Sequence, residues 1–135
     1  MLKPHHHPLI ILSICFSSHA IADCSSNQVI GTAISTALSG NTICTTGSQE
    51  EHHSNGELWD YKTGDTNHAT DPRKQIGEWS VSGDNVVYNY DDGHKTSSFS
   101  FTLFSNGGNS YSFCDNSSEV ASATIVDGSL GFSGC

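Results

Sequence analysis

The chain changes its pattern of apolar and polar positions near residue 40. Between Ser25 and Gly40 the apolar residues recur at intervals of three and four, which is the period of an amphipathic helix. Ser25 or Ser26 can cap the start of this helix and Gly40 can end it. The interior Gly31 would cost about 1 kcal/mol relative to Ala. The segment therefore predicts one helix before the rest of the domain.

After Gly40, short runs of aromatic and β-branched residues alternate with turn residues. The runs predict seven strands, at 41–46, 56–62, 76–82, 85–90, 97–105, 109–115 and 120–126. Gly and Asn between several of the runs supply the positive φ that tight hairpins need. Such an antiparallel meander must close or stack on itself to remove its exposed edges. We therefore predict an all-β fold, a small antiparallel meander closed into a barrel and capped by the helix, with a sandwich as the alternative.

A polar stretch from Gln49 to His68 interrupts the strand pattern. Its first part, Gln49–Gly56, is typical of an exposed loop at one mouth of the barrel, leading into the strand that follows. The stretch combines His, Glu, Trp and Tyr, which bind partners through hydrogen bonds, stacking and cation–π contacts. Partly protonated His would make such binding depend on pH. We expect any protein partner to bind at this rim.

The first 22 residues predict a secretory signal peptide. Lys3 lies in a polar start, Leu9–Phe16 is a short apolar core, and Ala20–Ala22 matches the small-x-small cleavage pattern. About eight apolar residues are too few to cross a bilayer, which needs roughly 20. Processing as a lipoprotein at Cys15 is the alternative, although the residue before it is a bulky Ile.

Cleavage would leave a single domain, residues 23–135, in the periplasm or secreted medium. This domain would carry four Lys and Arg against 14 Asp and Glu, a net charge of −10. Such a charge disfavours nucleic acid, which is bound by clustered Lys and Arg. It suits a basic protein partner, for example a cationic hydrolase such as a lysozyme. We expect no membrane insertion.

The mature domain holds four cysteines. An even number in an exported chain of this size predicts two disulfides. The residues are Cys24, Cys44, Cys114 and Cys135. Three pairings are possible, and we favour Cys24–Cys44 with Cys114–Cys135, since each bridge would close a loop of about 20 residues and add about 3 kcal/mol. A zinc site is disfavoured because no CxxC pair is present.

Several short motifs resemble those of small calycin-like, or lipocalin-like, barrels of exported bacterial proteins. They are Leu38–Thr42 (LSGNT), Gly56–Tyr61 (GELWDY), Gly77–Asp84 (GEWSVSGD) and Tyr111–Cys114 (YSFC). Lipocalins place their Gly-x-Trp near the first strand, whereas here it lies in the middle of the chain. The resemblance implies a barrel that binds something and assigns no catalytic residue.

Metal and hydrolase chemistry are the alternative interpretation of the polar stretch. His52 and His53 are adjacent and diverge in either a helix or a strand, so a metal site would need His68 or His94 as well. Glu50 or Glu51 with His52 could form an acid–base pair. No metalloprotease, EF-hand or phosphate-loop spacing is present, so we expect no cofactor.

Aromatic residues are the remaining candidates for a binding site. The candidate ligand-binding residues are Trp59, Tyr61, Trp79, Tyr88, His52 and His53. The rings could line the barrel or fill its core, since a barrel of about eight strands holds packed side chains or one small ligand. Our leading hypothesis is a non-enzymatic exported protein that binds a small amphipathic molecule or a basic protein. A small hydrolase or metal-binding protein is the alternative.

Overall fold

The computed structural model describes residues 23–46, 48–62, 73–91, 93–129 and 135. Its elements in chain order are β1 Gln28–Val29, α1 Thr32–Leu38, β2 Asn41–Thr45, β3 Ser48–His52, β4 Glu57–Lys62, β5 Lys74–Ser82, β6 Asn85–Asp91, β7 Thr96–Gly107, β8 Ser110–Asp115 and β9 Ser118–Asp127. The predicted signal peptide and most of the segment between β4 and β5, including His68, lie outside the described residues.

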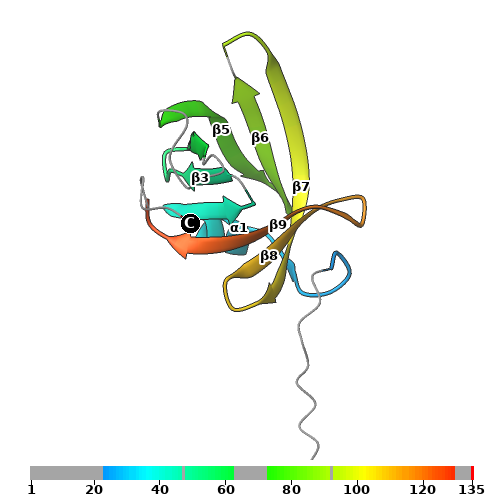
Figure 1. The fold of residues 1–135 in the computed structure, drawn as a ribbon. Coiled ribbons are helices and arrows are strands. Elements are labelled where there is room, and N and C mark those ends of the chain that lie inside the picture. Colours follow the sequence, from blue (N-terminus) through cyan, green and yellow to red (C-terminus); the bar gives the residue numbers. More distant parts are fainter. Residues whose placement is uncertain (1–22, 47, 63–72, 92, 130–134) are drawn as a thin grey trace, which may run out of the picture.

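Eight antiparallel strands close into a barrel (Figure 1). Strands β2 to β9 pair each with the next along the chain, and β9 returns to pair with β2 through Thr42 and Val126. The two-residue β1 adds to the barrel wall beside β7. The prediction of an all-β, closed antiparallel meander with one helix is confirmed, and the sandwich is not formed.

The helix is much shorter than predicted. Only Thr32–Leu38 is helical, and the residues before it form β1, with Asn27 before this strand and Gly31 after it at positive φ. A right-handed helix cannot continue through a positive φ. Ser25 does not cap the helix, and its backbone N–H instead donates to Asp23 Oδ1. Within the described residues, no helix is long and apolar enough to cross a membrane.

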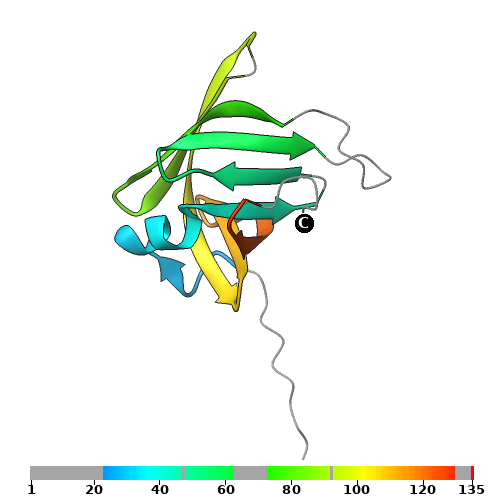
Figure 2. The same cartoon turned by 90° about the vertical axis from the view of Figure 1, so that its left-hand side faces the viewer.

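The helix closes one end of the barrel. Ile34 and Leu38 of α1 are fully buried in the core, among side chains that point inward from the strands. Figure 2 shows α1 at one end of β2–β4 and the C-terminal residue beyond the other end. The turns between β2 and β3 and between β8 and β9 lie at the end away from the helix, which no helix of the described residues covers.

The first half of the predicted loop at Gln49–Gly56 is instead a strand, while residues 53–56 form the expected turn. Residues Ser48–His52 form β3, which pairs with β2 on one side and β4 on the other. Gln49, Glu51 and His52 are each only 1% exposed. The prediction was wrong because polar side chains occupy both faces of β3, so the sequence lacks the alternation that marks a strand.

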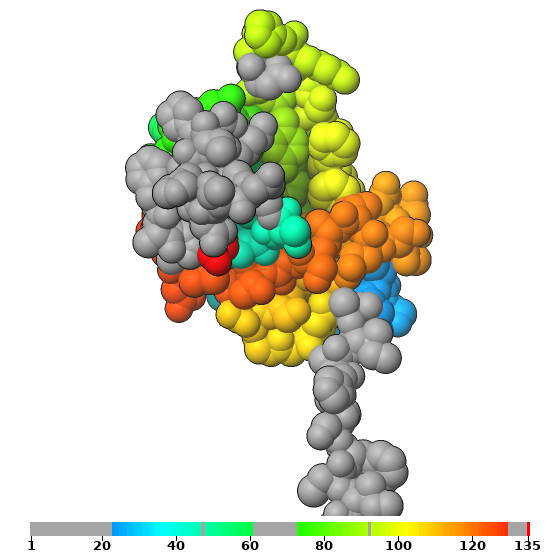
Figure 3. All heavy atoms as spheres, in the orientation of Figure 1, coloured from blue at the N-terminus to red at the C-terminus, as the bar shows by residue number. Residues whose placement is uncertain are grey.

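Strands β6 and β7 continue beyond the rest of the barrel as an arm (Figure 1). In Figure 3 this green to yellow arm rises above β9, which crosses the front of the molecule in orange. Strand β7 pairs with β6 through Thr96–Phe101 and with β8 through Thr102–Gly107. The outer half of β7 therefore leaves the barrel, and Phe99 on it is 46% exposed.

The disulfides are Cys24–Cys114 and Cys44–Cys135, so the favoured pairing was wrong. The short loops were favoured because closing them loses little chain entropy. The barrel instead brings cysteines that are distant in the sequence next to each other. Strands β1 and β8 flank β7, which places the N-terminal segment near Cys114. Cys135 lies at the outer face of β2 and β3, where it is bonded to Cys44 and its backbone N–H donates to Gln49 Oε1 at 3.2 Å.

A β-bulge on β5 predicts that Gly77 tolerates no side chain. Leu58 pairs with Gly77 and Trp59 with Gln75, so Ile76 between them has no partner on β4. A Cβ on Gly77 would lie 2.0 Å from the backbone oxygen of Asn89. We expect Gly77→Ala to lower the free energy of unfolding by more than about 2 kcal/mol in urea denaturation.

The control for this substitution is Gly83→Ala. Gly83 lies in the β5–β6 turn at a φ of 60°, and a Cβ there would meet nothing within 4 Å. It should cost about 1 kcal/mol from the left-handed backbone alone. Equal losses for the two variants would contradict the steric explanation.

Candidate functional site

Strand β3 sends its side chains alternately to the inside and outside of the barrel. Glu50 and His52 contact Tyr90 and Tyr88 of β6 across the interior. Glu51 lies on the outer face. The predicted rim therefore contains two separate groups of residues, one inside the barrel and one outside it.

The inner group lies at the barrel end opposite the helix, in a cavity of about 260 Å³. Its lining residues are Ile43, Thr45, Ser48, Glu50, Tyr88, Tyr90, Phe101, Phe113, Val120 and Ala121. They come from β2, β3, β6, β7, β8 and β9, so six of the eight barrel strands contribute. Because rigid paired strands hold these side chains, the cavity is largely preformed.

Aromatic rings form a continuous wall of this cavity. Tyr88 stacks on Tyr90 with 5.8 Å between ring centroids and an interplanar angle of 15°. Phe101 and Phe113 contact Tyr88 at centroid distances of 6.1 and 6.3 Å. These separations lie within the range at which aromatic rings attract one another.

Glu50 is the acidic group of the cavity. The Tyr90 hydroxyl donates to its carboxylate, with both oxygens at 3.3 Å. Asp60 of β4 is the direct cross-strand partner of Glu50, so their Cβ atoms are about 5 Å apart. Burial, with the Asp60 carboxylate adding to it, raises the pKa of Glu50 to about 7.

His52 is a neutral group beneath the cavity. Burial lowers its pKa to about 4, so the ring is uncharged at neutral pH. Its Nδ1 lies 3.4 Å from the Glu50 carbonyl oxygen, which can only accept, and this assigns the proton to Nδ1. Nε2 then accepts from the Tyr88 hydroxyl at 2.8 Å. The Trp79 ring, 5.2 Å from the His52 ring, is part of the buried core.

The outer group is a network around the buried Glu51 carboxylate. Arg73 donates to Glu51 Oε2 through Nε at 3.0 Å and Nη2 at 2.6 Å, and His53 Nε2 lies 3.1 Å from the same oxygen. Ser129 donates to Oε1. Burial alone would raise the pKa of Glu51, but these hydrogen bonds outweigh it and lower the pKa to about 2. Arg73 also lies over the Trp59 ring, 4.4 Å from its centroid.

This outer network has the residue types of a hydrolase but not the geometry. A nucleophilic Ser must contact its general base, with an acid orienting that base. Here Ser129 and His53 bind different oxygens of one Glu51 carboxylate. The network instead holds Ser129 and Arg73 against the outer face of β3 and β4.

The candidate metal ligands are not brought together. His52 lies inside the barrel and His53 outside it, while His68 lies outside the described residues. Among the described residues there is no group of three or more His, Cys, Asp or Glu that could hold a metal ion. The side chain of Tyr61 is also outside the described part of the chain.

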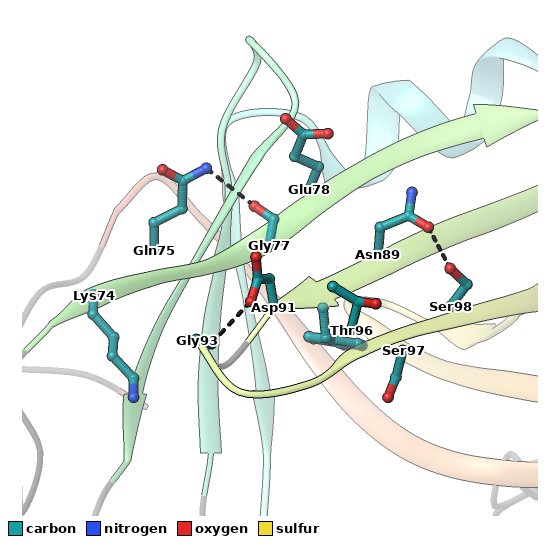
Figure 4. A pocket seen from close by; sticks show the side chains of 11 residues that line it. Lys74, Gln75, Gly77, Glu78, Asn89, Asp91, Gly93, Thr96, Ser97 and Ser98 are labelled. Atoms are coloured by element: carbon teal, nitrogen blue, oxygen red, sulfur yellow. Dashed lines mark hydrogen bonds between the residues drawn. The ribbon is translucent and has the colours of Figure 1, made fainter.

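A second and larger concavity, of about 750 Å³, runs along the arm (Figure 4). Short polar side chains line most of it and several bind one another, as Ser98 does when it donates to Asn89 Oδ1 at 2.6 Å. Gln75 Nε2 likewise donates to the Gly77 carbonyl at 3.3 Å. Tyr90 is the one aromatic residue among the described residues that line this groove, whereas four aromatic residues line the smaller cavity, so the smaller cavity is the better candidate.

No protein-family model, curated protein or solved structure matches this chain. Its function must be inferred from its own geometry.

The sequence predicted only part of the inner site. Of the candidate rings, Tyr88 lines the cavity, whereas Trp59 lies on the outer face and Trp79 in the core. Glu50 was named only as part of an acid–base pair and was not among the predicted ligand-binding residues. The signal that could have found it is the spacing of Ser48, Glu50 and His52, which share one face if the segment is a strand.

Proposed function

We propose that this protein binds a small amphipathic ligand in the cavity at the open end of its barrel. The observation that carries the proposal is the combination of four aromatic rings with one hydrogen-bonded carboxyl, Glu50, in a cavity of about 260 Å³. Binding sites are mostly apolar with a few polar groups that orient the ligand. Pockets for drug-sized ligands have volumes of about 300–1,000 Å³, so this ligand is smaller.

The hydrogen bonds of the site support binding without catalysis. In the described residues, the Tyr88 hydroxyl donates to His52, and the Ser129 hydroxyl donates to Glu51. Each of these hydroxyls donates its proton to a structural partner, and neither is arranged as a nucleophile that faces a substrate. A basic protein partner stays a prediction, since the outer Trp59 and Arg73 contact each other and form part of the Glu51 network.

We propose that the domain works outside the cytoplasm as a calycin-like barrel. The predicted signal peptide of residues 1–22 supports export, and two disulfides are typical of an oxidising compartment. A closed antiparallel barrel with one end plugged by a helix is compatible with the calycin-like architecture.

The ligand proposal can be tested by NMR titration with 2-phenylethanol, a neutral probe with an aromatic body. We expect amide shifts to cluster on the cavity strands, around Ile43, Glu50, Tyr88 and Phe113. Ala121→Phe should fill the cavity, because the partly buried Ala121 lines it, and should abolish these shifts. Shifts that are absent, or that survive in the folded Ala121→Phe protein, would contradict the proposal.

A further inference from the structure

Resting on the proposed function, we propose that the ligand is a protonated organic amine, whose ammonium group binds at Glu50 while its apolar body packs against the aromatic wall. The inference names the class of ligand, which the cavity shape alone does not specify.

The charge of the cavity selects a cation. Glu50 lines it, and none of the lining residues is a Lys, Arg or His. The carboxyl of Asp60, which is 7% exposed, lies on the adjacent strand directly opposite Glu50. An anion entering this space would meet two acidic groups at close range, whereas an ammonium group would gain a charge-assisted hydrogen bond.

The aromatic wall supports the same choice. Tyr88, Tyr90, Phe101 and Phe113 present π surfaces to one small volume that also contains a carboxyl. Ring faces carry partial negative charge and attract cations within about 6 Å of the ring centroid. A carboxyl and several rings around a single cavity are complementary to a positive group attached to an apolar body.

Burying the Glu50 carboxyl beside Asp60 lowers the stability of the fold, and ligand binding gives a reason for placing it there. A carboxyl buried beside another carboxyl is less stable than an apolar residue of similar size. Burial and Asp60 hold Glu50 partly protonated near neutral pH. In the described part of the chain, the Tyr90 hydroxyl donates across a long 3.3 Å to each oxygen of Glu50, so the carboxylate retains acceptor capacity. Strongly perturbed acids in cavities are characteristic of functional sites.

The test compares three probes that share one body and differ in head-group charge: 2-phenylethylamine, 2-phenylethanol and phenylacetate. Dissociation constants would be measured by isothermal titration calorimetry with the mature, oxidised protein at pH 7.5. We expect the amine to bind at least about tenfold more tightly than the alcohol, and phenylacetate to bind more weakly than either.

Glu50→Gln keeps the shape of the side chain and removes its charge. We expect it to weaken amine binding by at least about tenfold more than it weakens alcohol binding. The matched control is Glu78→Gln, which removes the same charge from a residue that does not line the cavity. It should leave binding of both probes unchanged.

The outcomes separate the inference from the proposed function. If the alcohol binds in the cavity and the amine binds no more tightly, the inference is overturned while the proposed function stands. If Glu78→Gln weakens amine binding as much as Glu50→Gln does, the amine is attracted by the net negative charge of the protein, and the inference is likewise overturned. If none of the three probes binds, both the inference and the proposed function are overturned.

Discussion

Replacing both cysteines of the Cys44–Cys135 bridge with serine is expected to lower the free energy of unfolding by about 4 kcal/mol. The two bridges span 90 and 91 residues, and their loops interlock. With Cys24–Cys114 intact, the shortest covalent path between Cys44 and Cys135 runs through that bridge and covers only about 41 residues. The same argument gives a similar loss for removing Cys24–Cys114 alone.

Removing both bridges should cost more than twice the loss from one. Once the first bridge is gone, the second closes its full loop of about 90 residues, worth about 4.6 kcal/mol in the chain-entropy model. The sum approaches the whole stability of a small domain, which is about 5–15 kcal/mol. We expect the cysteine-free domain to be largely unfolded at 37 °C.

Urea denaturation of the wild type, the two double variants and the quadruple variant would measure these losses. Peptide mapping of the oxidised wild type is the control, because it must recover Cys24–Cys114 and Cys44–Cys135. A loss below about 1 kcal/mol for either double variant would show that the native bridge does not stabilise the fold through the unfolded chain.

The second large effect concerns the pH dependence of stability, where Glu50 and His52 oppose each other. The pKa of Glu50 rises from 4.5 to about 7 on folding, so its contribution is present below pH 4.5 and is lost as the pH rises towards 7. The pKa of His52 falls from 6.5 to about 4, so its contribution is present above pH 6.5 and is lost as the pH falls towards 4.

Between about pH 4.5 and 6.5 the two effects should cancel. The folded protein holds a proton on Glu50 and none on His52, while the unfolded chain holds the reverse, so the pair binds one proton in each state. Folding then neither takes up nor releases a proton at this pair, and its contribution to stability stays flat.

Single substitutions should reveal the pH dependence of stability that each residue contributes and that cancels in the wild type. In Glu50→Gln, stability should rise with pH across this window relative to the wild type, by up to about 1.4 kcal/mol per pH unit. In His52→Gln, stability should fall as the pH rises, with a similar slope. The Gln side chain can still accept a hydrogen bond from the Tyr88 hydroxyl.

Urea denaturation at several pH values from 4.5 to 6.5 would compare each variant with the wild type. The double variant is the control, and its slope should return to that of the wild type. Parallel pH profiles for the wild type and both single variants would mean that neither group is held in the protonation state described here.

Local sequence patterns predicted the strands whose two faces differ. In β6, Val86 and Tyr88 point inward between more exposed neighbours, and in β7 the same alternation places Leu103 in the core. A strand with one buried and one solvent-exposed face alternates apolar and polar residues with a period of two. This pattern can be recognised in the sequence without knowing the partner strand. Strand β3 was missed because the outer network buries its second face too.

The sequence by itself determined the all-β class, the closed meander, most strand positions and the presence of two disulfides. These features depend on the order and spacing of residues close together in the chain. Only the tertiary structure decided the cysteine pairing, the division of Glu50 and Glu51 between the inside and outside of the barrel, and the meeting of Glu50 with Tyr90. Those depend on which strands become neighbours when the barrel closes, and residues that are 40 or 90 positions apart leave no local pattern.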